Sequence, residues 1–282
     1  MDGLLHLGRS GLAALLRAAA LIAFAAAGFS AHAEGNGRSS SVVADARVGQ
    51  TAEPQGDDLA VPDTELGPVF MLSVGGKLYD DLWNVLGQSV PPGRNSAFPA
   101  EVQINPRETW RCVTCHGWDY RGGEGEQARR LPGARFPGLR DLDGADPVAV
   151  GDRIRAAHGA FLTGEVPELA IDILGAFLSA GQANEADFFD GSGRSLGNPE
   201  SGRDIFEGAC INCHQIDGRR FLHGEEGDRS SLGWVVRNRP EQALHKIMNG
   251  VPATEMLALR FMEYWQIADL LAYLQALDPD ER

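Results

Sequence analysis

The chain has 282 residues, of which 43% are hydrophobic and 23% are charged, with 35 glycines, 15 prolines and four cysteines. This composition excludes a collagen-like repeat, a disulfide-dense miniprotein and a wholly disordered chain, and it leaves room for one or two ordinary globular cores. The formal net charge is −14. Nucleic acids and anionic lipid surfaces carry the same sign and would repel the chain, so a basic partner protein is favoured instead.

The first 33 residues have the pattern of a secretory signal peptide. Arg9 and Arg17 form a weakly basic lead, an apolar run extends from Ala18 to Phe29, and Ala31 and Ala33 give the A-x-A pattern of a cleavage site. We predict cleavage after Ala33 and export to the periplasm. The alternative is an uncleaved anchor, but the apolar run is short of the ~20 residues that span a bilayer. No later segment suits a membrane span.

The next segment, residues 34–68, is polar, contains three prolines and has no sustained hydrophobic period, which predicts a flexible leader. Order should begin near Val69. Apolar residues between positions 78 and 86 recur at helical spacing, and Gly87 is a typical helix stop. Residues 88–106 contain four prolines and are expected to form a loop.

Two copies of one cysteine motif follow. The first is Cys112-Val113-Thr114-Cys115-His116 and the second is Cys210-Ile211-Asn212-Cys213-His214, so every cysteine belongs to a C-x-x-C-H frame. This pattern is typical of the covalent attachment of c-type haem. The two thiols add to the vinyl groups of the haem, and the next residue is held under the iron, where its imidazole can bind. We therefore predict two covalently attached haem c groups.

Disulfides or a zinc site are the alternatives for these cysteines. Zinc ribbons usually separate their cysteine pairs by ~15–20 residues, whereas these pairs are 98 residues apart. Neither alternative explains a histidine directly after each pair. Haem attachment is therefore favoured, through Cys112, Cys115, Cys210 and Cys213, with His116 and His214 as axial iron ligands.

The rest of the chain carries further helical patterns, and they repeat. They lie at Pro147–Ala157, at Pro167–Ala180, from Pro199 toward the second motif with Asn198 as N-cap, at Pro240–Met248 and from about Phe261 to Leu277. Each half of the chain has a helix near C-x-x-C-H, a long loop, a short helix after a proline and a final amphipathic helix. The fold class is therefore mainly α, with two tandem helical domains and long irregular loops. We expect domains at 69–181 and 198–282, joined by a linker at 182–197.

A six-coordinate haem needs a second ligand opposite the motif histidine, and histidine and methionine are common donors. Met256 lies 42 residues after His214, in a loop before the last helix, and is the predicted ligand of the second haem. Met248 and Met262 are the alternatives. His158 lies 42 residues after His116 and is the predicted ligand of the first haem; there Met71 or an open position is the alternative.

If these assignments hold, the two haems differ in reduction potential. Methionine opposite histidine raises the potential, so electrons should run from haem 1 to haem 2. Among the other conspicuous side chains, Trp110, Trp118 and Tyr120 are expected to pack against the haem rather than to relay electrons. His223 and His245 are expected at the surface.

The second half, about Asn198 to Asp278, resembles a class I cytochrome c domain. The matching features are Gly202 and Phe206 before the motif, the Asn249–Pro252 turn, Met256 and a final helix with Tyr264, Trp265 and Tyr273. The first half is similar but divergent, because Gly76 and Tyr79 stand far from its motif and the axial methionine is missing. Residues 69 to 278 together resemble a periplasmic dihaem cytochrome c. The resemblance implies one-electron transfer to or from a partner redox protein.

Two enzyme families also carry two such motifs. Dihaem cytochrome c peroxidases are similar, but their motifs are farther apart. Dihaem thiosulfate dehydrogenases resemble this chain in size, but a cysteine serves there as distal ligand and no fifth cysteine exists here. An electron carrier is therefore favoured over an enzyme. His158 discriminates between them, because a permanent histidine ligand closes the iron to small-molecule substrates.

Overall fold

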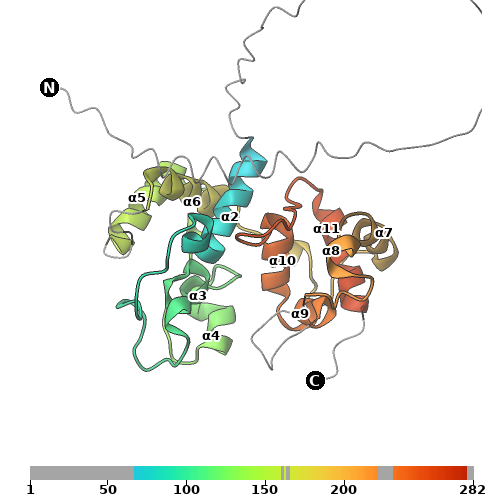
Figure 1. Cartoon of the computed structure of the whole chain (residues 1–282), viewed down its shortest axis with the longest axis horizontal. Coiled ribbons are helices and arrows are strands. Elements are labelled where there is room, and N and C mark those ends of the chain that lie inside the picture. The colour runs from blue at the N-terminus through green and yellow to red at the C-terminus, as the bar shows by residue number, and fades with distance from the viewer. Residues whose placement is uncertain (1–66, 160–161, 163–165, 222–230, 278–282) are drawn as a thin grey trace, which may run out of the picture.

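The structure is a computed structural model that describes residues 67–159, 162, 166–221 and 231–277. Those residues form ten α-helices, labelled α2 to α11, and no β-sheet; their one isolated β-bridge pairs Phe189 with Ser195 (Figure 1). The predicted mainly α class is confirmed. The predicted signal peptide, nearly all of the predicted leader and His223 lie outside the described residues. Within them, no helix is both long and apolar enough to cross a membrane.

The first half contains five helices. They are α2 (Pro68–Val85), α3 (Cys112–His116), α4 (Glu126–Arg130), α5 (Pro147–His158) and α6 (Glu168–Ala180), with 3-10 turns at Pro106–Trp110, Gly122–Glu124 and Arg140–Leu142. The α2 helix starts with a proline in its first turn, where the missing N–H costs nothing. It kinks at Asp81, which has φ −151° and ψ 88°. The α2 helix begins at Pro68, ten residues before the first apolar residue of the predicted pattern. The loop predicted over residues 88–106 follows the helix.

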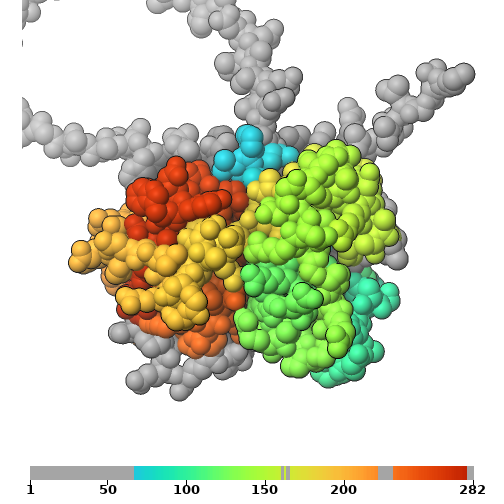
Figure 2. All heavy atoms as spheres, turned by 180° about the vertical axis from the view of Figure 1, so that it is seen from behind, coloured from blue at the N-terminus to red at the C-terminus, as the bar shows by residue number. Residues whose placement is uncertain are grey.

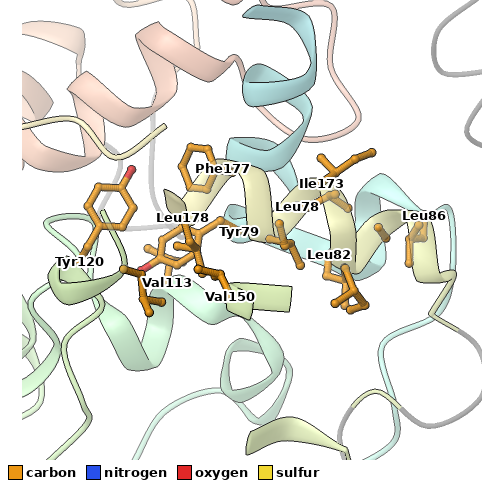
Figure 3. Close-up of a cluster of buried hydrophobic side chains, with 14 of the residues drawn as sticks. Leu78, Tyr79, Leu82, Leu86, Val113, Tyr120, Val150, Ile173, Phe177 and Leu178 are labelled. Atoms are coloured by element: carbon orange, nitrogen blue, oxygen red, sulfur yellow. The ribbon is translucent and has the colours of Figure 1, made fainter. Parts of the chain in front are cut away.

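The first core lies between α2, α3, α5 and α6 (Figure 3). Figure 3 labels Leu78, Tyr79, Leu82, Leu86, Val113, Tyr120, Val150, Ile173, Phe177 and Leu178. The α2 and α6 helices cross at Gly75, where a Cβ atom would overlap the Cβ of Phe177. Only glycine allows this close approach of the two helices.

The second half also contains five helices. They are α7 (Pro199–Ala209), α8 (Ile211–His214), α9 (Leu232–Asn238), α10 (Pro240–Asn249) and α11 (Tyr264–Ala276). The predicted N-cap is confirmed, because the Asn198 side chain accepts a hydrogen bond of 2.8 Å from the Glu200 N–H. The α7 and α11 helices cross at Gly202, where a Cβ atom would overlap the backbone oxygen of Asp269.

The second core packs around Phe206, Leu244, Met248 and Ile267, and it is separate from the first core. The predicted linker at 182–197 adds the buried Phe188 and Phe189 to it and contains a 3-10 turn at Glu185–Asp187. This segment therefore packs as part of the second half.

The two halves lie side by side, with α2 at their junction (Figure 2). The α10 helix of the second half packs against α2 of the first. This contact buries His245, which has only 1% of its surface exposed. The expectation that His245 lies at the surface is wrong, because that expectation treated α10 as the helix of an isolated domain.

Candidate functional site

The first cysteine motif forms a single helical turn, α3. Cys112 and Cys115 are three residues apart, so they lie on one side of that turn, with His116 beside them. Gly117 ends the turn with φ 78°, and its N–H donates to the Val113 carbonyl at 2.9 Å. The left-handed φ favours glycine at this position. The local sequence therefore presents two thiols and an imidazole together.

The motif histidine faces His158, the predicted distal ligand. The ring centres of His116 and His158 are 6.1 Å apart, with 68° between the ring planes. His116 is in α3 and His158 is the last residue of α5, so two elements far apart in sequence supply the pair. Because an imidazole nitrogen binds a first-row metal at about 2 Å, two imidazoles on opposite sides of one iron have ring centres roughly 6 Å apart. The spacing fits a shared iron.

Hydrogen bonds hold both imidazoles in place. His116 Nδ1 lies 2.8 Å from the Pro137 carbonyl oxygen, and His158 Nδ1 lies 3.2 Å from the Ile154 carbonyl oxygen. A carbonyl oxygen only accepts, so each Nδ1 carries a proton and donates it, and each Nε2 is the ring nitrogen that stays available to a metal. Metal-binding histidines commonly use this second hydrogen bond to fix their orientation.

A cavity of about 270 Å³ lies at this pair. Its walls include both cysteines of the motif, both histidines and mainly apolar side chains: Tyr79, Leu82, Phe98, Phe136, Leu139, Ile154, Leu162, Leu174 and Leu178. An apolar cavity with a few convergent donor atoms suits a flat apolar ring system with a metal at its centre. The donor set and its spacing therefore fit a haem attached to α3.

Burial sets the protonation of these groups. It raises the pKa of the Cys112 and Cys115 thiols to about 12 and lowers the pKa of His116 to about 4. At neutral pH the thiols are protonated and the imidazole is neutral. Neutral imidazole is the form that binds a metal.

Tyr79 belongs to this site, although sequence analysis did not assign it there. It lines the cavity from α2, and its hydroxyl donates to the Gly117 carbonyl at 2.6 Å. The signal was present in the sequence: a glycine with an aromatic residue four positions later occurs in both halves, as Gly75 with Tyr79 and as Gly202 with Phe206. Gly75 is thus the counterpart of Gly202, a role expected of its neighbour Gly76.

The three aromatic side chains expected to pack against the haem, Trp110, Trp118 and Tyr120, do not line the cavity. Trp118 and Tyr120 are buried, but they are not among the residues that line the cavity. Both contact His245 instead, with ring centres 4.9 Å and 6.3 Å from its ring. They belong to the junction between the two halves.

The second motif lies at the margin of the second core. Cys210 packs against that core, Cys213 is exposed, and His214 meets Phe221 edge-on with ring centres 5.7 Å apart. Burial raises the pKa of Cys210 to about 11 and lowers the pKa of His214. Met256 is partly buried against the same core. Cys210 of the second motif and Met256 therefore pack against the same core.

The alternative methionines are placed differently. Met248 is fully buried within the second core, and Met262 packs partly buried against it. Met71 packs at the edge of the first core and is not among the residues that line the cavity. Residues 222–230, between His214 and Met256 in the chain, lie outside the described residues. His214 and Met256 as a facing pair therefore stay a prediction.

The geometry argues against a zinc site made from both cysteine pairs. One pair lies in the first half and the other in the second, each at its own core. Across the part of the chain that the structure describes, no three His, Cys, Asp or Glu side chains gather closely enough to hold a metal ion.

No protein-family model, curated protein or solved structure matches this chain.

Proposed function

We propose that the chain is an exported dihaem c-type cytochrome that carries single electrons between two covalently attached haems and a partner redox protein. The observation that carries the proposal is the pair of facing imidazoles, His116 and His158, with ring centres 6.1 Å apart beside two cysteines in one apolar cavity. When bound, each haem supplies a reversible one-electron couple at its iron.

The side chains of the first site have separate tasks. Cys112 and Cys115 would attach the haem, and His116 and His158 would hold its iron. The carbonyls of Pro137 and Ile154 hold the two imidazoles in orientation. Two histidine ligands leave no iron position for a substrate. This favours electron transfer over a peroxidase-like or thiosulfate dehydrogenase-like reaction.

The second site completes the electron path. Cys210 and Cys213 attach the second haem, His214 binds its iron, and Met256 is the proposed distal ligand. A histidine and methionine pair gives a higher potential than two histidines, so with these ligands electrons would flow from the first haem to the second. The acidic chain favours a basic redox partner and disfavours nucleic acid.

His158→Ala tests the proposal. In chain produced with haem maturation, mass spectrometry should find two covalent haems in both the parent and the variant. The variant should lose one low-spin signal in its absorption and electron paramagnetic resonance spectra, and that iron should bind carbon monoxide. Met71→Leu is the control and should leave both spectra unchanged. An unchanged low-spin pair in His158→Ala would exclude His158 as a ligand, and a chain without covalent haem would refute the proposed function.

A further inference from the structure

The α10 helix has two buried sides. Leu244, Ile247 and Met248 belong to the second core. Glu241, His245 and Asn249, spaced four residues apart, are also buried and form a polar stripe. Buried polar groups cost free energy unless they have hydrogen-bond partners. The stripe finds many of those partners in the first half.

His245 is the centre of this stripe. Its Nε2 lies 2.9 Å from the Gly76 carbonyl oxygen, and its Nδ1 lies 3.0 Å from the Tyr120 hydroxyl. The carbonyl oxygen only accepts, so Nε2 carries the proton and donates. Nδ1 then accepts from the Tyr120 hydroxyl. The neutral imidazole therefore satisfies both nitrogens with groups of the other half.

Four rings surround the same imidazole. The ring centres of Trp118, Tyr79, Phe177 and Tyr120 lie 4.9, 5.8, 5.9 and 6.3 Å from that of His245. Tyr79 also lines the cavity of the first site, and Trp118 is two residues beyond His116. The preceding residue, Leu244, lies in the core against which Cys210 and Met256 pack. His245 thus contacts a wall of the first site, and the residue before it belongs to the core of the second half.

Charged groups reinforce the same junction. Asp80 on α2 binds Lys246 on α10 at 2.8 Å and also binds Arg111, the residue before Cys112. Arg129 in α4 binds Glu241 at 3.0 Å. These ion pairs fix α10 against the first half on both sides of His245.

We propose that His245 is the positioning residue that fixes the two haem-bearing halves against each other, so that electrons cross through the packed contact of Tyr79, His245 and α10. This inference rests on the proposed function. Electron tunnelling falls exponentially with separation and faster across gaps than through packed, bonded atoms. One electron crosses, oxidising the donor iron by one unit and reducing the acceptor iron by one, while Tyr79 and His245 keep their protons.

Three substitutions at position 245 test the role. Leucine in His245→Leu fills the space but removes the hydrogen bonds to the Gly76 carbonyl and the Tyr120 hydroxyl. Glutamine in His245→Gln offers one donor and one acceptor at similar reach, whereas the shorter amide of His245→Asn cannot reach both groups. Arg153→Ala is the control, because Arg153 pairs with Asp141 on the exposed surface.

Two measurements are made on the haem-loaded chain. After rapid photoreduction, the rate of electron transfer between the haems should fall at least tenfold in His245→Leu and His245→Asn and return to within a few fold in His245→Gln. Hydrogen exchange at the backbone amides of α2 and α10 should quicken in the same two variants. The control should change neither measurement. If His245→Leu does not fold, His245→Asn against His245→Gln gives the same comparison.

A slower rate together with faster exchange supports the role, and any other combination in the variants that fold overturns it. The haem content of the parent chain separates this result from the proposed function. If the parent carries no haem, the proposed function fails and this inference fails with it. If the parent carries two haems but the variants behave like the control, the role of His245 alone is wrong.

Discussion

Asp80 is a carboxylate with 1% of its surface exposed, and two cations compensate its charge. Burial would raise the pKa of Asp80, but the nearby charges of Lys246 and Arg111 together lower it. Because the pKa of Asp80 is lower in the folded chain than in the unfolded chain, its ionised carboxylate stabilises the fold. This stabilisation is present above the ordinary carboxyl pKa and is lost as the pH falls through the lowered value. The ion pairs should therefore hold the junction throughout the neutral range.

Asp80→Asn keeps the size of the side chain and removes its charge. It leaves Lys246 uncompensated and leaves Arg111 with Glu108 as its remaining ion-pair partner, so the free energy of unfolding should fall by about 3 kcal/mol, the lower end for a buried pair because both cations are partly exposed. Urea denaturation measures this change. Asp141→Asn, which breaks an exposed pair with Arg153, should cost less than about 1 kcal/mol. Equal effects of the two substitutions would contradict the proposed role of Asp80.

His245 should make stability depend on pH. Burial is the main cause that lowers its pKa to about 4, and Asp80, Lys246 and Arg260 act on it more weakly. An unfolded histidine has a pKa near ~6.5, so between about pH 6.5 and 4 the unfolded chain binds the proton and the folded chain does not. The free energy of unfolding should therefore decrease as the pH is lowered across this range.

The measurement compares the parent chain with His245→Gln in urea at a series of pH values. The parent should lose up to ~1 kcal/mol per pH unit more than the variant between about pH 6.5 and 4, since only the parent has this histidine. Above pH 7 the difference between the two chains should be constant. Parallel curves throughout would show that His245 is not buried in its neutral form.

At the scale of elements, the helix starts were predictable from local chemistry. Asp146 caps α5 and Asn198 caps α7, and in each the side chain accepts from an N–H in the first turn. The early start of α2 was not predictable, because Gly75 and Gly76 read as helix breakers. Tertiary contacts override that preference: Gly75 lies against Phe177 and Gly76 lies against Asn249.

Two glycines in α7 give a matched test of helix crossing. A Cβ at Gly202 would overlap the backbone of Asp269 in α11, whereas a Cβ at Gly208 meets nothing within 4 Å. Gly202→Ala should therefore destabilise the protein by about 1–3 kcal/mol, because the backbone cannot move aside cheaply. Gly208→Ala should stabilise it by up to ~1 kcal/mol through helix propensity. Thermal unfolding of both variants would show opposite shifts, and shifts of the same sign would contradict the crossing.

At the scale of the molecule, more of the residues at the first site than of the residues between the two halves could be predicted from the sequence. The motif and the equal spacing of His116 and His158 identified the facing pair. Tyr79 was not assigned because it lies 33 residues before Cys112, whereas Phe206 lies four before Cys210. His245 was not predicted because the polar stripe of α10 looks solvated in a single domain. Only the docking of the two halves explains its burial.

The order of the two potentials is the last consequence of the whole arrangement. Two histidines at the first iron and histidine with methionine at the second predict two resolved steps in a potentiometric titration, with the second haem higher. Met256→His should lower the higher step toward the other, because the stabilisation of ferrous iron by the thioether is lost. Met262→Leu, which changes the alternative methionine near the same core, should leave both steps in place. If the difference in potential between the two steps survives Met256→His but disappears in Met262→Leu, Met262 and not Met256 is the ligand of the second iron. If electrons take the proposed path from the first haem to the second, they leave from the higher-potential haem, and the proposed basic acceptor should dock at the second half.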